Sequence, residues 1–438
     1  MPVVLISPQF GGTRHASRVL GDYFQCAVML RYLLIDIPPR RRALTLWAIL
    51  AVAVCVKTAL LGGDYSVYRM FDGGSRHWWA DKSLYANYTI TEALDGYRYS
   101  PTFAVAFTPF YLLRDPYGAI VWGLVSIAVL VWALHVLVRD VLPCPRWHTD
   151  AWLPDQEGWF LGLALVGSIL GIWALQSNAI VTALIALALA AIVRQRWWTA
   201  SWLLAVPVFI KLWPIAIVLL LVVCWPRQLI GRLAAVGAAL ASIPFLTRPP
   251  NIVMWQYHQW YASLTGPLQG RWPGYRDAWT VWEQLCPLVR CQADLAPYRH
   301  TYMALQLLTA MAVLGWCFWQ RRRVQSVGRL LTLILSMWAS WQLLLGPGTE
   351  QLTYGIIAPS ASWAVLVSFA EKRARWATVT AWAMLSLLPA GDIEQAAIAV
   401  CPGGKALLPL GVVLLVAWLV WHERGKSPET QVASFPMS

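Results

Sequence analysis

The sequence predicts an all-α protein that crosses a membrane many times, and three observations support this prediction. Hydrophobic residues make up 58% of the 438 residues and charged residues only 13%, whereas soluble domains carry about 25% charged residues. The mean hydropathy is +0.54. Apolar runs long enough to cross a bilayer, which takes roughly 17–25 residues, recur along the whole chain. Together these features exclude an ordinary soluble domain.

About ten of the apolar runs are expected to be full transmembrane helices. A further apolar block, 199–224, lies between Arg196 and Arg227, which both favour the cytoplasm. We therefore predict a broken or re-entrant hairpin of two short helices there, with the break near Lys211 to Pro214, although two closely spaced full spans would give the same sidedness. The full crossings are expected at 43–62, 117–138, 158–175, 179–193, 229–246, 302–320, 327–345, 353–370, 375–390 and 406–422.

The distribution of basic residues predicts the orientation. With the N-terminal arm inside, 21 of the 34 Lys and Arg residues fall on the cytoplasmic side and 11 outside, as the positive-inside rule requires. The net charge of +13 is then explained by anionic lipid rather than by nucleic acid. We expect a cytoplasmic arm (1–42), one transmembrane domain (43–424) and a cytoplasmic tail (425–438), in the cell (inner) membrane.

Two long loops, 63–116 and 247–301, are then external. Within the first loop, 102–113 is apolar but too short to span, so it is expected to form an interfacial helix. In and beyond the second loop, Cys286, Cys291 and Cys401 lie on the same side. A Cys286–Cys291 disulfide is the simplest pairing, and free thiols are the alternative.

Asp64 is the leading candidate for catalysis, because it directly follows the first apolar run. A carboxylate at the mouth of a membrane span is costly to place, and partial desolvation raises its pKa toward that of a general base. A helix cap, or an ion pair with Arg69 or Arg98, is the alternative explanation.

Other polar residues also occur at span ends. Lys211 lies between apolar flanks, where a cation needs an anion such as a lipid phosphate; snorkelling to a headgroup is the alternative. The Gln176 to Asn178 segment could bind sugar hydroxyls or simply form a helix–helix turn. Glu350 begins a span as a second external carboxylate, and Arg276 in the second loop is a candidate for headgroup contacts. No clustered His or Cys metal motif is evident.

Three segments resemble glycosyltransferase family 87. The first runs from Gly63-Asp64-Tyr65-Ser66-Val67-Tyr68 through Leu84-Tyr85 to Tyr97-Arg98-Tyr99-Ser100-Pro101. It is similar to the family pattern DFxVYxxA…LY…FxYPPxxA. The second, Gln176 to Asn178 and then Ala200 to Pro214, is similar to GQxN…AGxxxGxAxxxKxxP. The third, Gly346 to Pro359, is similar to SPxSWxHHyxxxxP. The chain departs from these patterns at Leu175 (family Gly), at Ser100 (family Pro) and at the missing His pair of the third segment.

The resemblance implies a GT-C fold and an inverting, metal-independent transfer of a sugar, most simply mannose, from a polyprenyl-phosphate donor to a lipid or glycan acceptor. Asp64 would be the general base, and Lys211 with Arg98 would bind the donor phosphate. No cofactor beyond the donor substrate is implied, and the partners are the bilayer, the donor and the acceptor. The residues expected to orient sugar and acceptor are Tyr68, Tyr99, Gln176, Asn178, Glu350, Gln351, Tyr354 and Arg276.

Two other functions remain as alternatives. A lipid or glycolipid transporter or flippase would also span the membrane, but such proteins often contain internal repeats, and we find none in the sequence. A polymer transferase of the O-antigen-ligase type would also use a lipid-linked donor. In that case arginines of the loop 247–301, such as Arg276, would matter more than Asp64.

Overall fold

The structure, a computed structural model, describes residues 37–63, 66–86, 97–145, 151–265, 274–286, 298–324, 326–400 and 403–424. Regular structure in these ranges is helical, apart from an isolated bridge between Tyr275 and Glu350. The helices of the first half are α2 (Pro39–Leu61), α3 (Tyr68–Trp79), α4 (Pro101–Ala106), α5 (Thr108–Leu112), α6 (Tyr117–Asp140), α7 (Pro154–Trp173), α8 (Asn178–Val193), α9 (Trp197–Ile210) and α10 (Ile215–Cys224). Those of the second half are α11 (Pro226–Ser242), η2 (Ile243–Leu246), α12 (Pro250–Thr265), α13 (Ala278–Leu285), α14 (Arg299–Arg323), α15 (Val327–Leu345), η5 (Gln351–Ile357), α16 (Ala358–Glu371), α17 (Arg375–Ser386), α18 (Gly391–Val400), η6 (Gly404–Ala406) and α19 (Leu407–Arg424).

The all-α polytopic fold is confirmed. Within the described ranges, eight helical segments are long and apolar enough to cross a membrane. They are α2, α6, α7, α11 with η2, α14, α15, η5 with α16, and η6 with α19. Each corresponds to one of the expected crossings, so the apolar runs located most of the helices correctly.

The described residues contain fewer candidate crossings than the ten expected from the sequence. The expected span at 179–193 is α8, which has only 16 residues and is buried along nearly its whole length. The expected span at 375–390 ends early, because α17 stops at Ser386 and α18 follows at an angle of 115°. Counting that bent pair as one span raises the total in the described residues from eight to nine.

The predicted hairpin at 199–224 consists of α9 and α10. Helix α9 ends at Ile210, Lys211 is extended (φ −138°, ψ 139°), and α10 begins directly after Pro214. Irregular backbone at membrane depth is tolerated where protein surrounds it. Here α8 packs against α9, and α10 packs against α14 and α15.

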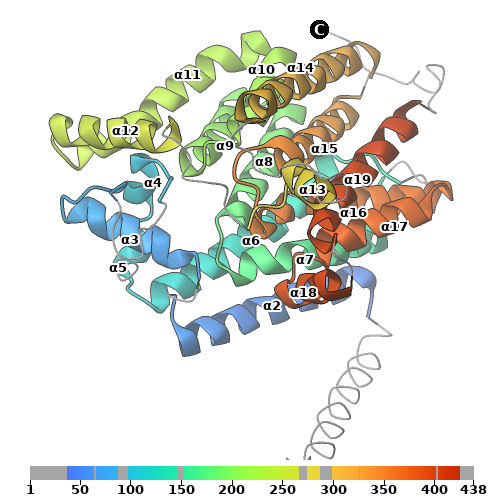
Figure 1. Ribbon diagram of the computed structural model, residues 1–438, viewed down its shortest axis with the longest axis horizontal. Coiled ribbons are helices and arrows are strands. Elements are labelled where there is room, and N and C mark those ends of the chain that lie inside the picture. Colours follow the sequence, from blue (N-terminus) through green and yellow to red (C-terminus); the bar gives the residue numbers. More distant parts are fainter. Residues whose placement is uncertain are drawn as a thin grey trace, which may run out of the picture.

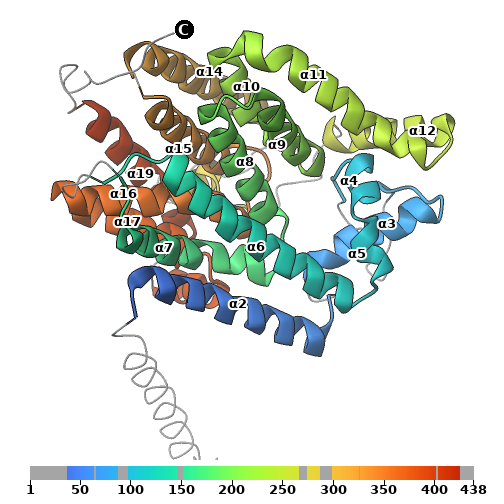
Figure 2. The ribbon, with the colours of Figure 1, turned by 180° about the vertical axis from the view of Figure 1, so that it is seen from behind.

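The short helices of the first predicted external loop, and α12 of the second, lie at one end of the helical body. Figures 1 and 2 both place α3, α4 and α5 at the end where α2 finishes, with α4 beside α12. The expected interfacial stretch 102–113 is formed by α4 and α5. Thr102 connects the two loops, since it bonds to the Tyr257 hydroxyl (2.9 Å) and donates to the Leu240 carbonyl (3.1 Å).

Cys286, at the end of α13, is disulfide-bonded. Its partner lies outside the described residues, as do Cys291 and Cys401. The free-thiol alternative therefore does not hold for Cys286, and its pairing with Cys291 stays a prediction.

Candidate functional site

Asp64 lies outside the described residues, but the chain on either side of it is well anchored. Before it, the Gly63 amide donates to the Asp115 carboxylate (2.7 Å), which precedes α6. After it, the Val67 amide donates to the Ala174 carbonyl (3.0 Å) at the end of α7. Val67 is thus attached directly beside the turn that leads to Gln176.

One departure from the family pattern lies in the turn between α7 and α8. Leu175, where the family has glycine, has φ +52°, a left-handed conformation that favours glycine at the end of a helix. The Gln176 amide donates to the Gly171 carbonyl (2.9 Å), and the Trp122 indole donates to the Leu175 carbonyl (2.9 Å). The leucine side chain is buried, and its packing offsets the backbone strain.

Gln176 is buried at this turn and accepts three hydrogen bonds through its side-chain oxygen. The donors are the Ser177 amide (2.9 Å), the Ser177 hydroxyl (3.2 Å) and the Tyr99 hydroxyl (3.4 Å). Burial and the nearby Glu350 carboxylate raise the pKa of Tyr99, so its phenol stays protonated and can donate.

Lys211 meets Asn178 and Tyr99 at the break between α9 and α10. The Lys211 ammonium donates to the side-chain oxygen of Asn178 (2.8 Å) and lies 5.7 Å from the centre of the Tyr99 ring. The side-chain nitrogen of Asn178 donates to the Leu352 carbonyl (2.8 Å). Both contacts orient the amide so that its oxygen faces the cation.

Glu350 completes this group, since its charge acts on both Tyr99 and Lys211. We call Tyr99, Gln176, Asn178, Lys211 and Glu350 the Lys211 cluster. Its members come from the chain before α4, the α7–α8 turn, the α9–α10 break and the chain before η5. The structure therefore brings together residues from all three segments that carry the family resemblance.

Ser100, the second departure from the family pattern, connects α4 to the break between α9 and α10. Its hydroxyl oxygen accepts from the Phe103 amide (3.1 Å) and caps α4. The same hydroxyl donates to the carbonyl of Phe209, in the last turn of α9. A proline at this position could make neither side-chain bond.

Arg276 lies in a separate polar group beside the Lys211 cluster. Two of its guanidinium nitrogens bond to the two carboxylate oxygens of Glu394 on α18, one of them at 3.1 Å, and both residues are buried. The Gln351 amide also donates to Glu394, and the Tyr354 hydroxyl donates to the Arg276 carbonyl (2.7 Å). We call Arg276, Gln351, Tyr354 and Glu394 the Arg276 clamp.

The clamp holds the chain that carries Glu350. The Arg276 amide donates to the Thr349 carbonyl (2.8 Å), and Tyr275 pairs with Glu350 in the isolated bridge. Of the residues predicted to contact sugar or acceptor, Arg276 and Gln351 thus bond to Glu394, and Tyr354 bonds to the Arg276 carbonyl.

Two other predicted residues are not part of either group. Tyr68, at the start of α3, is buried, and its hydroxyl donates to the Phe110 carbonyl (3.2 Å). Arg98 is exposed, and its carbonyl accepts from the Trp260 indole (3.1 Å). In the described part of the chain, no hydrogen bond or ion pair joins the Arg98 guanidinium to the Lys211 cluster.

The sequence analysis did not single out Glu394. The available signal was a carboxylate at the external end of a predicted span, but its partner lies 118 residues away in another loop. Across the described ranges, His, Cys, Asp and Glu side chains form no group of three suited to a metal ion.

A search of curated proteins finds no match to the chain. Among solved structures, the chain is similar to ArnT from Cupriavidus metallidurans, crystallised with undecaprenyl phosphate. The two are 13% identical with a TM-score of 0.42, over 87% of this chain and 77% of that one. The family model of glycosyltransferase family 87 matches residues 97–347, which is more than half of the chain. The chain is therefore a membrane protein that belongs to glycosyltransferase family 87.

Proposed function

We propose that the protein transfers a sugar, most simply mannose, from a polyprenyl-phosphate donor to a lipid or glycan acceptor on the external face of the membrane. Membership of a glycosyltransferase family and the membrane-spanning fold support this proposal. The observation that carries it is the Lys211 ammonium at a break between two apolar helices, bonded to a neutral amide. A cation in that setting is suited to an anionic lipid phosphate.

The proposed reaction is a single displacement. The acceptor hydroxyl oxygen attacks the anomeric carbon of the donor while the bond from that carbon to the phosphate oxygen breaks. Asp64 takes the proton of the hydroxyl as general base, and the phosphate leaves with the bonding electron pair. Lys211 stabilises the negative charge that develops on the leaving oxygen. The sugar is inverted at its anomeric carbon, and no metal takes part.

The remaining residues have supporting roles in this proposal. Within the Lys211 cluster, the sugar is oriented by Tyr99, Gln176, Asn178 and Glu350. The chain that carries Glu350 is held in place by Gln351, Tyr354 and Arg276 of the Arg276 clamp. Tyr68 orients the acceptor from α3. Arg98 contacts the phosphate from the exposed side, once donor is bound.

The experiment compares Asp64→Asn with wild type, using polyprenyl-phosphate-mannose and isolated membranes. Loss of a general base lowers the rate by about 10²–10⁴-fold. Asp81→Asn is the matched control, because Asp81 lies in the same loop in an exposed ion pair with Arg248 (3.1 Å), and it should keep wild-type turnover. Wild-type turnover by Asp64→Asn would remove Asp64 from the mechanism. Counterflow of donor without any product would instead indicate a transporter.

A further inference from the structure

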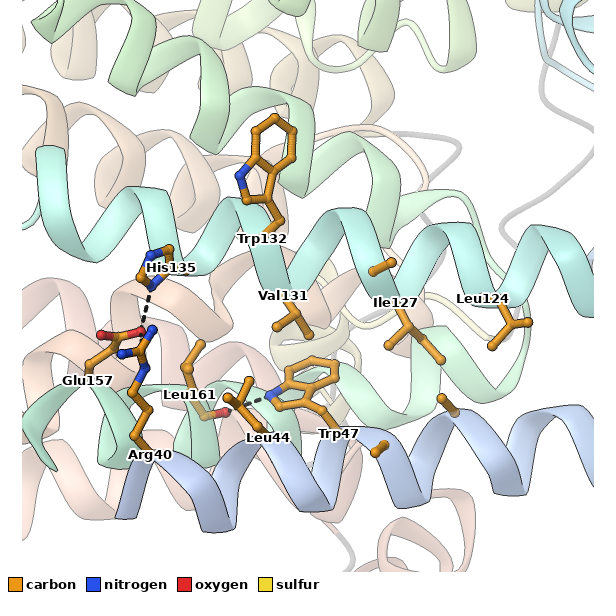
Figure 3. A pocket seen from close by; sticks show the side chains of 13 residues that line it. Arg40, Leu44, Trp47, Leu124, Ile127, Val131, Trp132, His135, Glu157 and Leu161 are labelled. Carbon is orange, nitrogen blue, oxygen red and sulfur yellow. Dashed lines mark hydrogen bonds and ion pairs between the residues drawn. The ribbon is translucent and has the colours of Figure 1, made fainter. Parts of the chain in front are cut away.

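A groove of about 430 Å³ lies between α2 and α6, with α7 beneath it. Figure 3 shows its lining, which contains no residue of the Lys211 cluster or the Arg276 clamp. Its volume falls within the range of small-molecule sites, which is about 300–1,000 Å³. Its lining comes from the first half of α2, the middle of α6 and the first two turns of α7.

The groove has the length of one membrane leaflet. Its lining runs from residue 40 to 51 on α2 and from 124 to 135 on α6. At a rise of 1.5 Å per residue, each stretch is roughly 16 Å long. That is about half of the hydrocarbon core, which is roughly 30 Å thick. A chain inserted from one membrane surface would therefore end near the midplane.

Small side chains keep the groove open. Ala48 and Ala51 on α2 and Ala128 on α6 line it, where larger residues would fill the space. The indole of Trp47 is fixed beside them by a hydrogen bond to the Leu161 carbonyl of α7 (3.2 Å). The result is a mostly apolar channel between α2 and α6.

One end of the groove is polar, as Figure 3 shows for Arg40, His135 and Glu157. The buried Glu157 carboxylate lies 2.6 Å from the Nδ1 nitrogen of His135 and 3.3 Å from the Nε nitrogen of Arg40. It orients both basic groups, while the Arg40 side chain stays 43% exposed. Arg41 and Arg42 follow in the first turn of α2, while the first turn of α7 carries Asp155 and Glu157, so three arginines outnumber two carboxylates at this end.

We propose that the groove binds an anionic phospholipid, with one acyl chain along the channel and the phosphate at Arg40 and His135. The bilayer supplies this ligand at high concentration, and the excess of arginine favours an anionic headgroup over a zwitterionic one. The positive-inside pattern assigns the site to the cytoplasmic leaflet, on the opposite side of the membrane from the proposed donor site. The proposal does not depend on the proposed sugar transfer.

The test measures lipid binding by the full-length protein, purified in detergent, using native mass spectrometry with added phosphatidylglycerol or phosphatidylcholine. Wild type should bind one phosphatidylglycerol at a concentration at least tenfold lower than phosphatidylcholine. The double variant Ala48→Leu/Ala51→Leu fills the channel and should lose this binding. Ala59→Leu is the matched control, because Ala59 is exposed on the same helix but outside the groove. It should bind as wild type does.

A second variant tests the contact with the lipid headgroup separately from the contact with the acyl chain. Arg40→Gln should reduce the preference for phosphatidylglycerol and leave binding of phosphatidylcholine unchanged. The proposal is overturned if the double variant binds phosphatidylglycerol as wild type does, or if wild type does not distinguish the two lipids. Should the double variant fail to fold, Ala128→Leu on α6 fills the same channel and is measured in its place.

Discussion

Lys211 and Arg276 are cations in neighbouring parts of the structure that are held in opposite ways. Arg276 is buried and bonded through two nitrogens to a buried carboxylate, Glu394. Lys211 is partly buried, and its hydrogen-bond acceptor is the neutral amide of Asn178. Among the described residues, no carboxylate lies within ion-pair distance of its ammonium.

This difference separates a structural cation from one that can bind a ligand. A buried ion pair that is fully satisfied fixes the position of the chain, and breaking it leaves a costly unpaired charge. A cation that bonds to an amide and lies over an aromatic ring, with no carboxylate in direct contact, keeps more of its positive potential for an incoming anion. The Arg276 clamp therefore fits the role of support, and the Lys211 cluster that of ligand contact.

The largest effect is expected when the clamp is broken. Arg276→Ala leaves the Glu394 carboxylate buried without its partner, which should lower the free energy of unfolding by about 3–5 kcal/mol. Denaturant unfolding in detergent measures this change. The double variant Arg276→Met/Glu394→Met removes both charges and should recover most of the loss. A single variant as stable as wild type would show that the pair does not hold the fold.

Removing the Lys211 charge should affect the reaction rather than the fold. Lys211→Met keeps an apolar stem of similar length, so thermal stability should equal or exceed that of wild type. Sugar transfer should fall by about 10²–10³-fold, as when one electrostatic donor is removed from an active site. Lys57→Met is the control, since Lys57 on α2 bonds the Trp173 carbonyl (2.8 Å) outside the cluster. Equal activity of the two variants would contradict the proposed role.

Asn178→Asp would make the Lys211 cluster resemble the Arg276 clamp. The new carboxylate would pair with the ammonium at the position of the present 2.8 Å hydrogen bond. Hydrogen bonds to charged groups contribute about 1.5–3 kcal/mol, so donor affinity should fall roughly 10–100-fold while the protein stays folded. The KM for the donor in membranes measures this effect. An unchanged KM would mean that the phosphate does not compete for Lys211.

The smallest effect is expected at Tyr99. Tyr99→Phe removes the 3.4 Å hydrogen bond to Gln176 but keeps the ring near Lys211, at a cost of about 0.5–1.5 kcal/mol. Because the pKa of Tyr99 lies above its ordinary value, the phenol does not titrate in the working range. The pH profiles of wild type and variant should therefore coincide up to pH ~10. An alkaline limb that disappears in the variant would contradict this.

The sequence predicted the features that depend on local pattern. Apolar runs located the long helices, and the basic residues flanking 199–224, together with Pro214, indicated the break at Lys211. The family motifs grouped Tyr99, Gln176, Asn178, Lys211 and Glu350, which the structure places together.

Other features could not be predicted because they depend on distant contacts. Periodicity does not show that Arg276 pairs with Glu394, since the two lie in different loops. It also could not show that α8 is enclosed by protein along nearly its whole length, because an apolar helix has the same composition in lipid as in a protein core. The left-handed backbone of Leu175 could not be predicted from the sequence, because leucine usually avoids that conformation.

The positive charge of Lys211 has a consequence for turnover under the proposed reaction. The sugar–phosphate diester arrives with one negative charge, but the polyprenyl phosphate left behind is a monoester with about −1.5 to −2 charges at neutral pH. The same ammonium should therefore hold the spent carrier more tightly than the fresh one. Product release would then limit the rate, and added polyprenyl phosphate should act as a competitive inhibitor.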